Sequence, residues 1–479
     1  MKNRDRNISV GAVTVASLPN FMLAAIFVAV SVSLFLRVTH GQSEPVTTDV
    51  FLGHWEGVIE AEFPQGVRLD VSRTEGRLGG VIGIPISGYA PMKLTDAAID
   101  KHALSFSIDG LTDARMVLFL VERDLVGEFH LNGAAHSVSL GRRPVDLARD
   151  PRRPQTPLPP FPYDVKDIEY HNDALTLAGT LTIPKGAKSV GGVVLLPGSD
   201  GSDRDCSWYA HKTFLVLADF LTRAGFAVLR ADSRGVGGSD GVFDGASLSD
   251  RAADALAAVA YLRAQPTIDV NRVGLIGFSE GGWVADLAAT RSKDVHFIIL
   301  LSTPARPGIE TLIEAKTKEV SRRPDAQEKV MVFSRLIDIA MQTNDEVQDS
   351  RELDELEAMR RPARGKAAKV RRDSIERGLR KLRSKHEQSV LRFDPGPILQ
   401  GVEMPCLAVL GDTDLVVDAA KSERAYRAAL RRKEQIVKVF SDLNHMLQPC
   451  TDSSQPPPLI ETTIDPRVLG FVKDWLAQQ

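Results

Sequence analysis

The residues whose types and spacing favour chemistry most clearly lie in segment 277–282, which reads GFSEGG. An apolar run, 273–276, precedes this segment, and residues 283–289, which have a helical composition, follow it. A strand, a tight turn with the pattern Gly-x-Ser-x-Gly and a helix make up a nucleophile elbow. In that motif glycines let the strand and the helix approach, and the serine hydroxyl stands exposed. The pattern predicts that Ser279 is a nucleophile that attacks a carbonyl carbon.

A second copy of the Gly-x-Ser-x-Gly pattern occupies residues 237–241. The pattern alone arises by chance in roughly one chain of this length in ten, so its context decides its meaning. Ser239 has no predicted strand directly before it and no predicted helix directly after it. We therefore interpret Ser239 as part of a loop and keep Ser279 as the nucleophile.

A serine hydroxyl becomes a good nucleophile only when a base accepts its proton. In enzymes with a nucleophile elbow, the acid and then the histidine follow the serine along the chain. The three histidines after Ser279 are His296, His386 and His445. His296 precedes an apolar strand and His386 belongs to a charged insert, whereas His445 follows the predicted strand 436–440 in a loop. We predict that His445 is the base; the alternative is a histidine of a surface loop.

The acid is expected in the loop after the preceding predicted strand, 406–411. That loop continues as DTDLVVD, so it offers Asp414 as the first choice and Asp412 as the second. A carboxylate at this place holds the histidine in the productive tautomer and stabilises the imidazolium that forms during the reaction. We predict Asp414 as the partner of His445.

An oxyanion hole needs two backbone N–H groups that are already oriented toward the developing negative charge. One is expected from Glu280, directly after the nucleophile, and the other from the loop after an early strand. Loop 196–201 follows the predicted strand 192–196 and offers Ser199 or Asp200 as the second donor.

The overall composition, with 43% hydrophobic and 25% charged residues, is typical of a soluble globular protein. A chain of 479 residues is long enough for two or three domains, each with its own core. The net charge of -3 gives no argument for nucleic acid or an anionic membrane, and three cysteines show no metal-site spacing. We expect no metal, no organic cofactor and no nucleic-acid partner.

The N-terminal segment, 1–41, has the organisation of an export signal. Lys2, Arg4 and Arg6 precede an apolar run, 21–36, and Gly41 offers a cleavage position. The run is slightly long for a signal peptide and slightly short for a free transmembrane helix, so a cleaved signal and a retained membrane anchor both remain open. Either one would place the rest of the chain outside the cytoplasm, because the basic end stays inside.

Residues 47–143 are predicted to form a small β-rich domain. Apolar and polar side chains alternate in 67–71, 104–108 and 138–140, and glycines separate these stretches. An antiparallel barrel or a sandwich fits this pattern. The proline-rich segment 144–164 is predicted to be a stiff linker between domains.

Residues 165–479 alternate apolar runs with stretches of helical spacing, which predicts an α/β domain with a mostly parallel sheet. An insert at about 305–393 interrupts the alternation. Its segment 344–357 is mainly acidic and its segment 360–385 is mainly basic. We hypothesise two antiparallel helices that pair their opposite charges and cap the sheet's C-terminal edge; the alternative is two solvated helices without a functional role.

From about residue 165 onward the chain resembles the α/β-hydrolase superfamily, in the bacterial branch of exported esterases and serine aminopeptidase-like hydrolases. The segments that carry the resemblance are Gly198-Ser199, Asp203-Arg204-Asp205, Asp232-x-Arg234-Gly235-x-Gly237, Gly277-x-Ser279-Glu280-Gly281-Gly282, Gly411-x-x-Asp414 and Asn444-His445-x-x-Gln448. The resemblance implies an α/β-hydrolase fold, a β-rich N-terminal domain and acyl hydrolysis by a serine triad. Two departures are Phe278, where the branch usually has histidine, and 200–202, where it usually has Gly-Pro-Gln.

The residues and the resemblance together predict a serine hydrolase that cleaves carboxylic esters through an acyl-enzyme, with Ser279, His445 and Asp414 in the roles given above. A serine peptidase or aminopeptidase, or a thioesterase, would use the same three residues and is the first alternative. A non-catalytic cell-surface binding protein on the same scaffold is the second. In an exported chain, a disulfide between Cys206 and Cys450 would join the loop after the oxyanion segment to the histidine loop.

Overall fold

The computed structural model describes most of the chain after residue 47. The described residues are 48–60, 65–84, 91–100, 103–109, 111, 114–131, 134–145, 153–199, 201–321, 325–342, 346–360, 366–451 and 459–479. The predicted signal or anchor segment, 1–41, lies outside them. Within these ranges, none of the helices combines the length and the apolar character needed to cross a bilayer.

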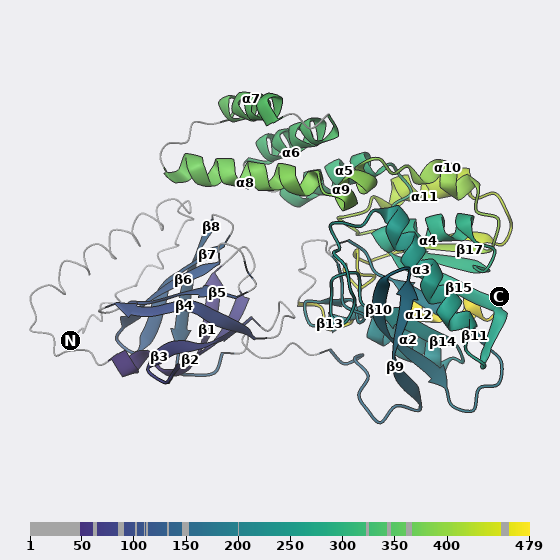
Figure 1. Cartoon of the computed structure of the whole chain (residues 1–479), viewed down its shortest axis with the longest axis horizontal. Helices are drawn as coiled ribbons and strands as arrows, with labels where there is room; N and C mark the ends of the chain where they lie inside the picture. The colour runs from purple at the N-terminus through teal and green to yellow at the C-terminus, as the bar shows by residue number, and fades with distance from the viewer. Residues whose placement is uncertain are drawn as a thin grey trace, which may run out of the picture. The chain divides into compact units, whose positions relative to one another are not determined.

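The N-terminal part is a closed barrel of eight antiparallel strands (Figure 1). After the short 3-10 helix η2 (Thr48–Phe51), the strands are β1 (Gly53–Glu60), β2 (Gln65–Thr74), β3 (Arg77–Gly83), β4 (Met92–Asp100), β5 (Ala103–Ile108), β6 (Arg115–Val121), β7 (Asp124–Leu131) and β8 (Ala134–Gly141). Each strand pairs with the next one along the chain, and β8 closes the barrel by pairing with β1. The predicted all-β domain is confirmed, and it is a barrel.

The barrel interior is filled by apolar side chains. The alternation seen in the sequence places Leu69 of β2 and Leu104 of β5 among its fully buried residues. Trp55 and Phe106 are buried with them, as expected for a barrel of this strand number, whose interior is just wide enough for side chains. The interior of the barrel is therefore a packed hydrophobic core.

The C-terminal part is built on a mixed sheet of eight strands in the order β18-β17-β16-β15-β11-β14-β10-β9 (Figure 1). These strands are β9 (Tyr163–Asn172), β10 (Leu175–Pro184), β11 (Val190–Leu196), β14 (Ala227–Ala231), β15 (Ile268–Phe278), β16 (Phe297–Leu301), β17 (Cys406–Gly411) and β18 (Gln435–Phe440). The pairs β9–β10 and β10–β14 are antiparallel, and the other pairs are parallel. The predicted α/β-hydrolase fold is confirmed.

Helices cover both faces of this sheet. Two of them, α2 (Thr213–Arg223) and α12 (Pro466–Leu476), pack on one face. On the other face lie α3 (Leu248–Arg263), α4 (Glu280–Arg291), α10 (Pro395–Gln400) and α11 (Ala419–Ala429). The apolar run of β11 contributes side chains to the hydrophobic cores on both faces of the sheet: Val193 packs on the face covered by α2 and α12, and Val194 packs on the opposite face. The first turn of α3 is fixed by a capping box between Ser247 and Asp250.

Residues 153–162 of the proline-rich segment contain no helix or strand, whereas residues 163–164, which were also predicted as linker, belong to strand β9. Gln155 connects it to the end of the sheet domain, because its amide donates to the carbonyl of Ile464 at 2.7 Å and its side-chain oxygen accepts from the N–H of Thr463 at 2.6 Å. The first strand of the sheet, β9, begins at Tyr163, within the last two residues of the predicted linker.

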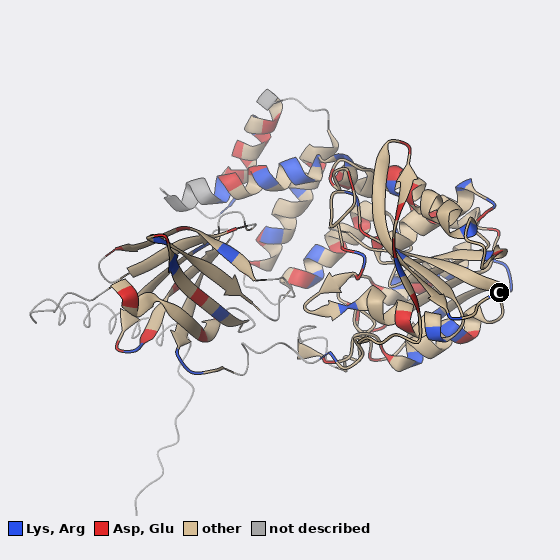
Figure 2. Cartoon of the chain, turned by 60° about the horizontal axis from the view of Figure 1, so that its bottom comes forward, with Lys and Arg blue, Asp and Glu red and all other residues tan. Residues whose placement is uncertain are grey.

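The described residues of the charged insert form five helices, which lie between β16 and α10 along the chain. They are α5 (Gly308–Val320), α6 (Ala326–Met341), α7 (Glu346–Ala358), α8 (Lys366–Leu382) and α9 (Lys385–Leu391). Acidic α7 and basic α8 are joined by ion pairs in antiparallel order. Figure 2 marks the acidic residues of α7 in red and the basic residues of α8 in blue. The pairs between the helices are Glu357–Arg371 at 2.5 Å and Asp354–Arg372 at 2.7 Å, and Asp349 of α7 also contacts Arg383, which directly follows α8. The predicted charge pairing between the two segments is confirmed.

Candidate active site

Ser279 lies at the sharp turn between β15 and α4, in a backbone conformation with φ 52° and ψ -123°. A non-glycine residue in this region costs about 1–3 kcal/mol and persists only where the surroundings enforce it. The enforcement is steric at the two flanking glycines: a Cβ on Gly277 would lie 2.3 Å from the carbonyl oxygen of Gly281, and a Cβ on Gly281 would lie 2.2 Å from that of Leu196. The Ser279 N–H donates to the carbonyl of Leu301 at 2.8 Å, which fixes the turn to β16.

The structure brings Ser279, His445 and Asp414 into one hydrogen-bonded line. The Nε2 atom of His445 lies 3.1 Å from Oγ of Ser279. The Nδ1 atom of the same ring lies 2.8 Å from Oδ2 of Asp414. With Nδ1 donating to the carboxylate, Nε2 is left as the acceptor for the serine proton. The arrangement can withdraw a proton from Ser279.

The carboxylate of Asp414 is buried and held from two sides. Its Oδ1 atom accepts from the N–H groups of Val416 and Val417 at 2.7 and 2.8 Å, while Oδ2 faces His445. The second-choice acid, Asp412, has another contact: its Oδ1 accepts from the N–H of Asp442 at 2.7 Å. The geometry therefore distinguishes the two aspartates, and Asp414 is the one that reaches the histidine.

Two parts of the chain that were predicted to supply the oxyanion hole meet at Ser279. Glu280 is the first residue of α4, where backbone N–H groups have no partner within the helix. The loop after β11 passes beside the nucleophile, since a Cβ built on Gly198 would lie only 3.3 Å from Cβ of Ser279. Ser199 follows in this loop and is exposed, whereas Asp200 lies outside the described residues.

A buried ion-pair cluster next to the nucleophile was not predicted. The carboxylate of Glu280 contacts the guanidinium of Arg251 and lies 3.4 Å from Nε2 of His386. Burial alone would raise the pKa of Glu280, but the hydrogen bond from His386 and the charge of Arg251 outweigh it and lower that pKa. From the sequence, His386 was assigned only to the insert. In the structure it contacts Glu280, the residue that follows the nucleophile.

Periodicity offers a signal that could have revealed Arg251. The buried residues of α3 include Leu248, Arg251 and Ala255, which follow one another at the three- and four-residue spacing of a core-facing helix side. A charged residue on the apolar side of a helix needs a buried partner. No comparable signal identifies the partner, because Glu280 and His386 are brought to it by the tertiary fold.

The helical insert contacts the site at two points. The Nζ atom of Lys318, in the last turn of α5, donates to the carbonyl of Asp414 at 3.3 Å. The start of α9 is held at the start of α3, where the side chain of Lys385 lies 2.7 Å from that of Asp250 and the hydroxyl of Ser389 accepts from Leu248 N–H at 2.9 Å. The insert therefore contacts the acid loop through α5 and, through α9, both the start of α3 and Glu280, the residue after Ser279.

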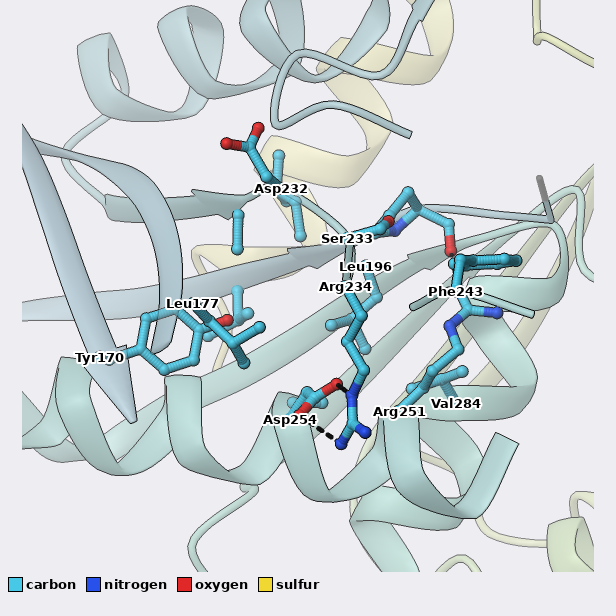
Figure 3. Close-up of a pocket in the computed structure, with 15 residues that line it drawn as sticks. Tyr170, Leu177, Leu196, Asp232, Ser233, Arg234, Phe243, Arg251, Asp254 and Val284 are labelled. Atoms are coloured by element: carbon cyan, nitrogen blue, oxygen red, sulfur yellow. Dashed lines mark hydrogen bonds and ion pairs between the residues drawn. The ribbon is translucent and has the colours of Figure 1, made fainter. Parts of the chain in front are cut away.

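A pocket of about 50 Å³ lies against the loop that follows β11 (Figure 3). Its lining includes Pro197, Phe243, Arg251, Arg234 and Asp254. Arg234 and Asp254 form an ion pair within it, with a contact of 2.8 Å. Ser279, His445 and Asp414 do not line this pocket. The pocket therefore lies next to the loop after β11 but does not include the nucleophile.

The second Gly-x-Ser-x-Gly segment has a structural role, as predicted. The hydroxyl of Ser239 donates to the carbonyl of Asp232 at 2.9 Å and accepts from the N–H of Ala178 at 3.0 Å. Ser239 therefore connects its loop to β10 and the end of β14.

The expected disulfide between Cys206 and Cys450 is not formed, so that prediction was wrong. Both residues carry buried thiols. Burial raises the pKa of the Cys206 thiol to about 12, which leaves little thiolate for oxidation. A backbone hydrogen bond holds each cysteine in its own loop. The N–H of Cys206 donates to the backbone carbonyl of Asp203 at 2.9 Å, and the N–H of Cys450 donates to the backbone carbonyl of Asp442 at 2.7 Å.

Asp286 is a fully buried carboxyl group on α4, two turns beyond the nucleophile, and neither of its side-chain oxygens has a hydrogen-bond partner among the described residues. Burial raises its pKa well above the ordinary value. Burial also raises the pKa values of the Cys406 thiol and the Tyr426 phenol, and the charge of an ionised Asp286 would raise them further. Burial therefore favours the protonated form of Asp286 in the folded protein.

This burial predicts a pH-dependent stability. Because its pKa is raised by burial, Asp286 keeps its proton in the folded protein at pH values where the unfolded chain, with a pKa of about 3.9, has lost it. The free energy of unfolding therefore falls as pH rises, by up to about 1.4 kcal/mol per pH unit. This fall ends once the pH has passed the pKa of Asp286 in the folded protein. Asp286→Asn removes this slope. Urea unfolding at pH 5 and pH 8 should show the variant gaining stability over wild type as pH rises, and the exposed Asp164→Asn control should show no such gain. An equal difference at both pH values would contradict the assignment.

Among the described residues, no group of three or more histidine, cysteine, aspartate or glutamate side chains is placed to hold a metal ion.

A protein-family model described as X-Pro dipeptidyl-peptidase (S15 family) matches residues 153–445, which is more than half of the chain and includes Ser279, Asp414 and His445. The chain belongs to this S15 family. It is therefore a serine hydrolase of the α/β-hydrolase superfamily.

Two kinds of relatives accompany this S15 assignment. Esterase EstD of Thermotoga maritima is 26% identical over 326 residues, which cover 67% of this chain and 69% of the relative. Among solved structures, the α/β hydrolase GrgF from Penicillium sp. sh18 gives a TM-score of 0.43 at 16% identity, with 66% of this chain and 98% of that chain covered. The Pyrococcus furiosus esterase PF2001 gives 0.41 at 17% identity, with 66% and 91% covered.

Proposed function

We propose that the protein hydrolyses carboxylic esters through an acyl-enzyme formed on Ser279, with His445 as general base and Asp414 as the residue that orients it. The observation that carries the proposal is the line from Asp414 Oδ2 through the imidazole to Ser279 Oγ, with contacts of 2.8 and 3.1 Å. A nucleophile, a base and an orienting acid within hydrogen-bond reach are what this chemistry requires.

In the first half of the reaction, Oγ of Ser279 attacks the carbonyl carbon while Nε2 of His445 takes the hydroxyl proton. The C=O π electrons move onto oxygen, and the N–H of Glu280 with an N–H of the loop after β11 stabilises this oxyanion. The tetrahedral intermediate then breaks its bond to the alkoxide, which leaves with the proton from His445. The product is an alcohol and an ester of Ser279.

In the second half, a water molecule replaces the alcohol. His445 takes one proton from the water as the oxygen attacks the acyl carbon, and the same two N–H groups stabilise the second oxyanion. The bond to Oγ then breaks and the proton on His445 returns to Ser279. The carboxylic acid is released and the enzyme regains its initial state.

Ester cleavage is the first choice of substrate class because the curated relative EstD, which matches over two thirds of this chain, is named an esterase. The S15 family description favours a second candidate, the hydrolysis of X-Pro peptides by the same three residues. A thioester would react by the same steps. The complete hydrogen-bonded line argues against a binding protein without catalysis, because binding alone requires no base at the serine.

A substrate panel separates these classes. We expect the purified protein to release p-nitrophenol from p-nitrophenyl esters of two to twelve carbons with a clear optimum of chain length, and to act far more slowly on aminoacyl and X-Pro p-nitroanilides. Acyl thioesters form a third arm. A kcat/KM for an X-Pro anilide above that for every ester would assign the peptidase reaction in place of the esterase reaction.

A further inference from the structure

Arg251 is a buried residue of α3 that contacts both segments proposed to form the oxyanion hole. Its Nη2 atom donates to the carbonyl oxygens of Pro197 and Gly198 at 2.8 and 3.0 Å. Its Nη1 atom contacts the carboxylate of Glu280, the residue directly after the nucleophile. Only 8% of Arg251 is exposed, so these contacts are made away from water, where their electrostatic strength is greatest.

The two carbonyl contacts fix the direction of two N–H groups. A trans peptide group is planar, and its N–H points opposite to its C=O. Because the carbonyl of Gly198 points to Arg251, the N–H of Ser199 in the same peptide plane points away from Arg251. The Cα of Gly198 lies beside Ser279, so this orientation is fixed at the place where the second oxyanion donor is needed.

The contact with Glu280 fixes the other segment. The Glu280 carboxylate is 7% exposed and accepts from Arg251 and from His386 of α9. The Arg251 guanidinium also lies 5.0 Å from the centre of the Phe243 ring, and that ring lies 4.6 Å from the His386 ring. Figure 3 shows Arg251 beside Phe243 in the pocket that borders the loop. One planar group therefore connects the loop after β11 with the start of α4.

We propose that Arg251 is a positioning residue, which aligns the two halves of the oxyanion hole by holding the carbonyls of Pro197 and Gly198 and the carboxylate of Glu280 in one plane. This inference rests on the proposed function, since an oxyanion hole matters only if Ser279 acylates. Arg251 does not touch the reacting atoms. Lysine can replace it only in part, because an ammonium keeps the charge but has no planar fork that holds the three acceptors in fixed directions.

An aligned donor acts on the transition state more than on the bound substrate, so the loss should appear in kcat. We expect Arg251→Met to lower kcat for the preferred ester by about 100-fold, the lower end of the effect of losing one oxyanion donor, with KM changed less than threefold. The affinity for a trifluoromethyl ketone, which binds serine hydrolases as a tetrahedral oxyanion, should fall by a similar factor. Arg251→Lys should lie between wild type and Arg251→Met in both measurements.

The matched control is Arg234→Met. Arg234 lines the same pocket and forms an ion pair with Asp254, but its contacts are to that carboxylate and to the carbonyl of Asp250, away from the oxyanion loop. Arg234 is 16% exposed against 8% for Arg251. This variant removes a less buried guanidinium from its carboxylate partner, so its thermal stability should fall while kcat and the affinity for the ketone change less than threefold. An equal loss of kcat in both methionine variants would show a general structural effect and would overturn the proposal.

The outcomes separate this proposal from the proposed function. If Ser279→Ala keeps ester hydrolysis, the nucleophile assignment is wrong. If Ser279→Ala is inactive while folded Arg251→Met or Arg251→Lys keeps kcat within twofold of wild type, only the role of Arg251 is wrong. Should Arg251→Met not fold, Arg251→Lys decides alone, because it keeps the buried charge beside Glu280 while losing the fork; a lower kcat with unchanged KM and weaker ketone binding supports the proposal.

Discussion

Replacing Ser279 with alanine is expected to lower kcat for ester hydrolysis by about a million-fold, because serine, histidine and acid act as one unit and the loss of the nucleophile removes all covalent catalysis. Alanine keeps the Cβ of serine, so the turn with φ 52° carries the same backbone strain in the variant. The fold should therefore be unchanged, and circular dichroism and thermal unfolding should match wild type. The measurement is the steady-state rate with the best ester of the substrate panel.

The second Gly-x-Ser-x-Gly copy supplies a matched control for this variant. Ser239→Ala removes two buried hydrogen bonds, to Asp232 and Ala178, and should reduce stability by about 1–3 kcal/mol without a comparable loss of turnover. If Ser239→Ala abolished turnover while Ser279→Ala kept it, the nucleophile would be assigned to the wrong copy of the motif.

Replacing Asp414 with asparagine should lower kcat by about ten thousand-fold while leaving the protein folded. The Oδ1 atom of Asp414 accepts from the N–H groups of Val416 and Val417, so the amide oxygen of asparagine will keep that place. Its NH2 group then faces Nδ1 of His445. The imidazole must accept there, its proton moves to Nε2, and Nε2 no longer takes the proton of Ser279.

Asp412→Asn is the control for this result. Asp412 accepts from the N–H of Asp442 at its own Oδ1 and has no part in the histidine contact. An asparagine oxygen can accept the same hydrogen bond, so kcat should change less than threefold. A loss of turnover in Asp412→Asn with an active Asp414→Asn would reverse the choice between the two aspartates.

The local parts of the fold and site are readable from the sequence because each is determined over a few residues. The elbow needs only an apolar run, small residues and a helix, and these stand next to one another around Ser279. Strand β17 begins and ends at the residues that its apolar pattern predicts, 406 and 411. The opposite charges of α7 and α8 are likewise visible as two blocks in the sequence, and they pair in the structure.

The antiparallel hairpin β9–β10 was not predicted from the sequence. Strand β9 begins within the last two residues of the predicted linker. It faces water on much of its length, so it lacks the continuous apolar run that marks the buried parallel strands. Its turn at Asp173 has φ 51°, a conformation that aspartate tolerates without a glycine signal. The pattern therefore indicated a parallel core but not its antiparallel edge.

The cluster around Glu280 could not be predicted, because it joins residues from three separate segments. Arg251 comes from α3, Glu280 from the elbow helix and His386 from the insert, and no local pattern relates them. The same limit applies to the disulfide that was expected from the positions of Cys206 and Cys450: closeness of two loops to one site does not bring their side chains together.

The central claim, that Ser279 is the acylated residue, is tested most directly by covalent labelling. Wild-type protein treated with a fluorophosphonate and digested should yield one modified peptide, with the mass of the phosphonyl group on Ser279 and none on Ser239. His445→Ala should label far more slowly, because the hydroxyl loses the base that lies 3.1 Å away. A label on another serine, or equally fast labelling in Ser279→Ala, would contradict the account.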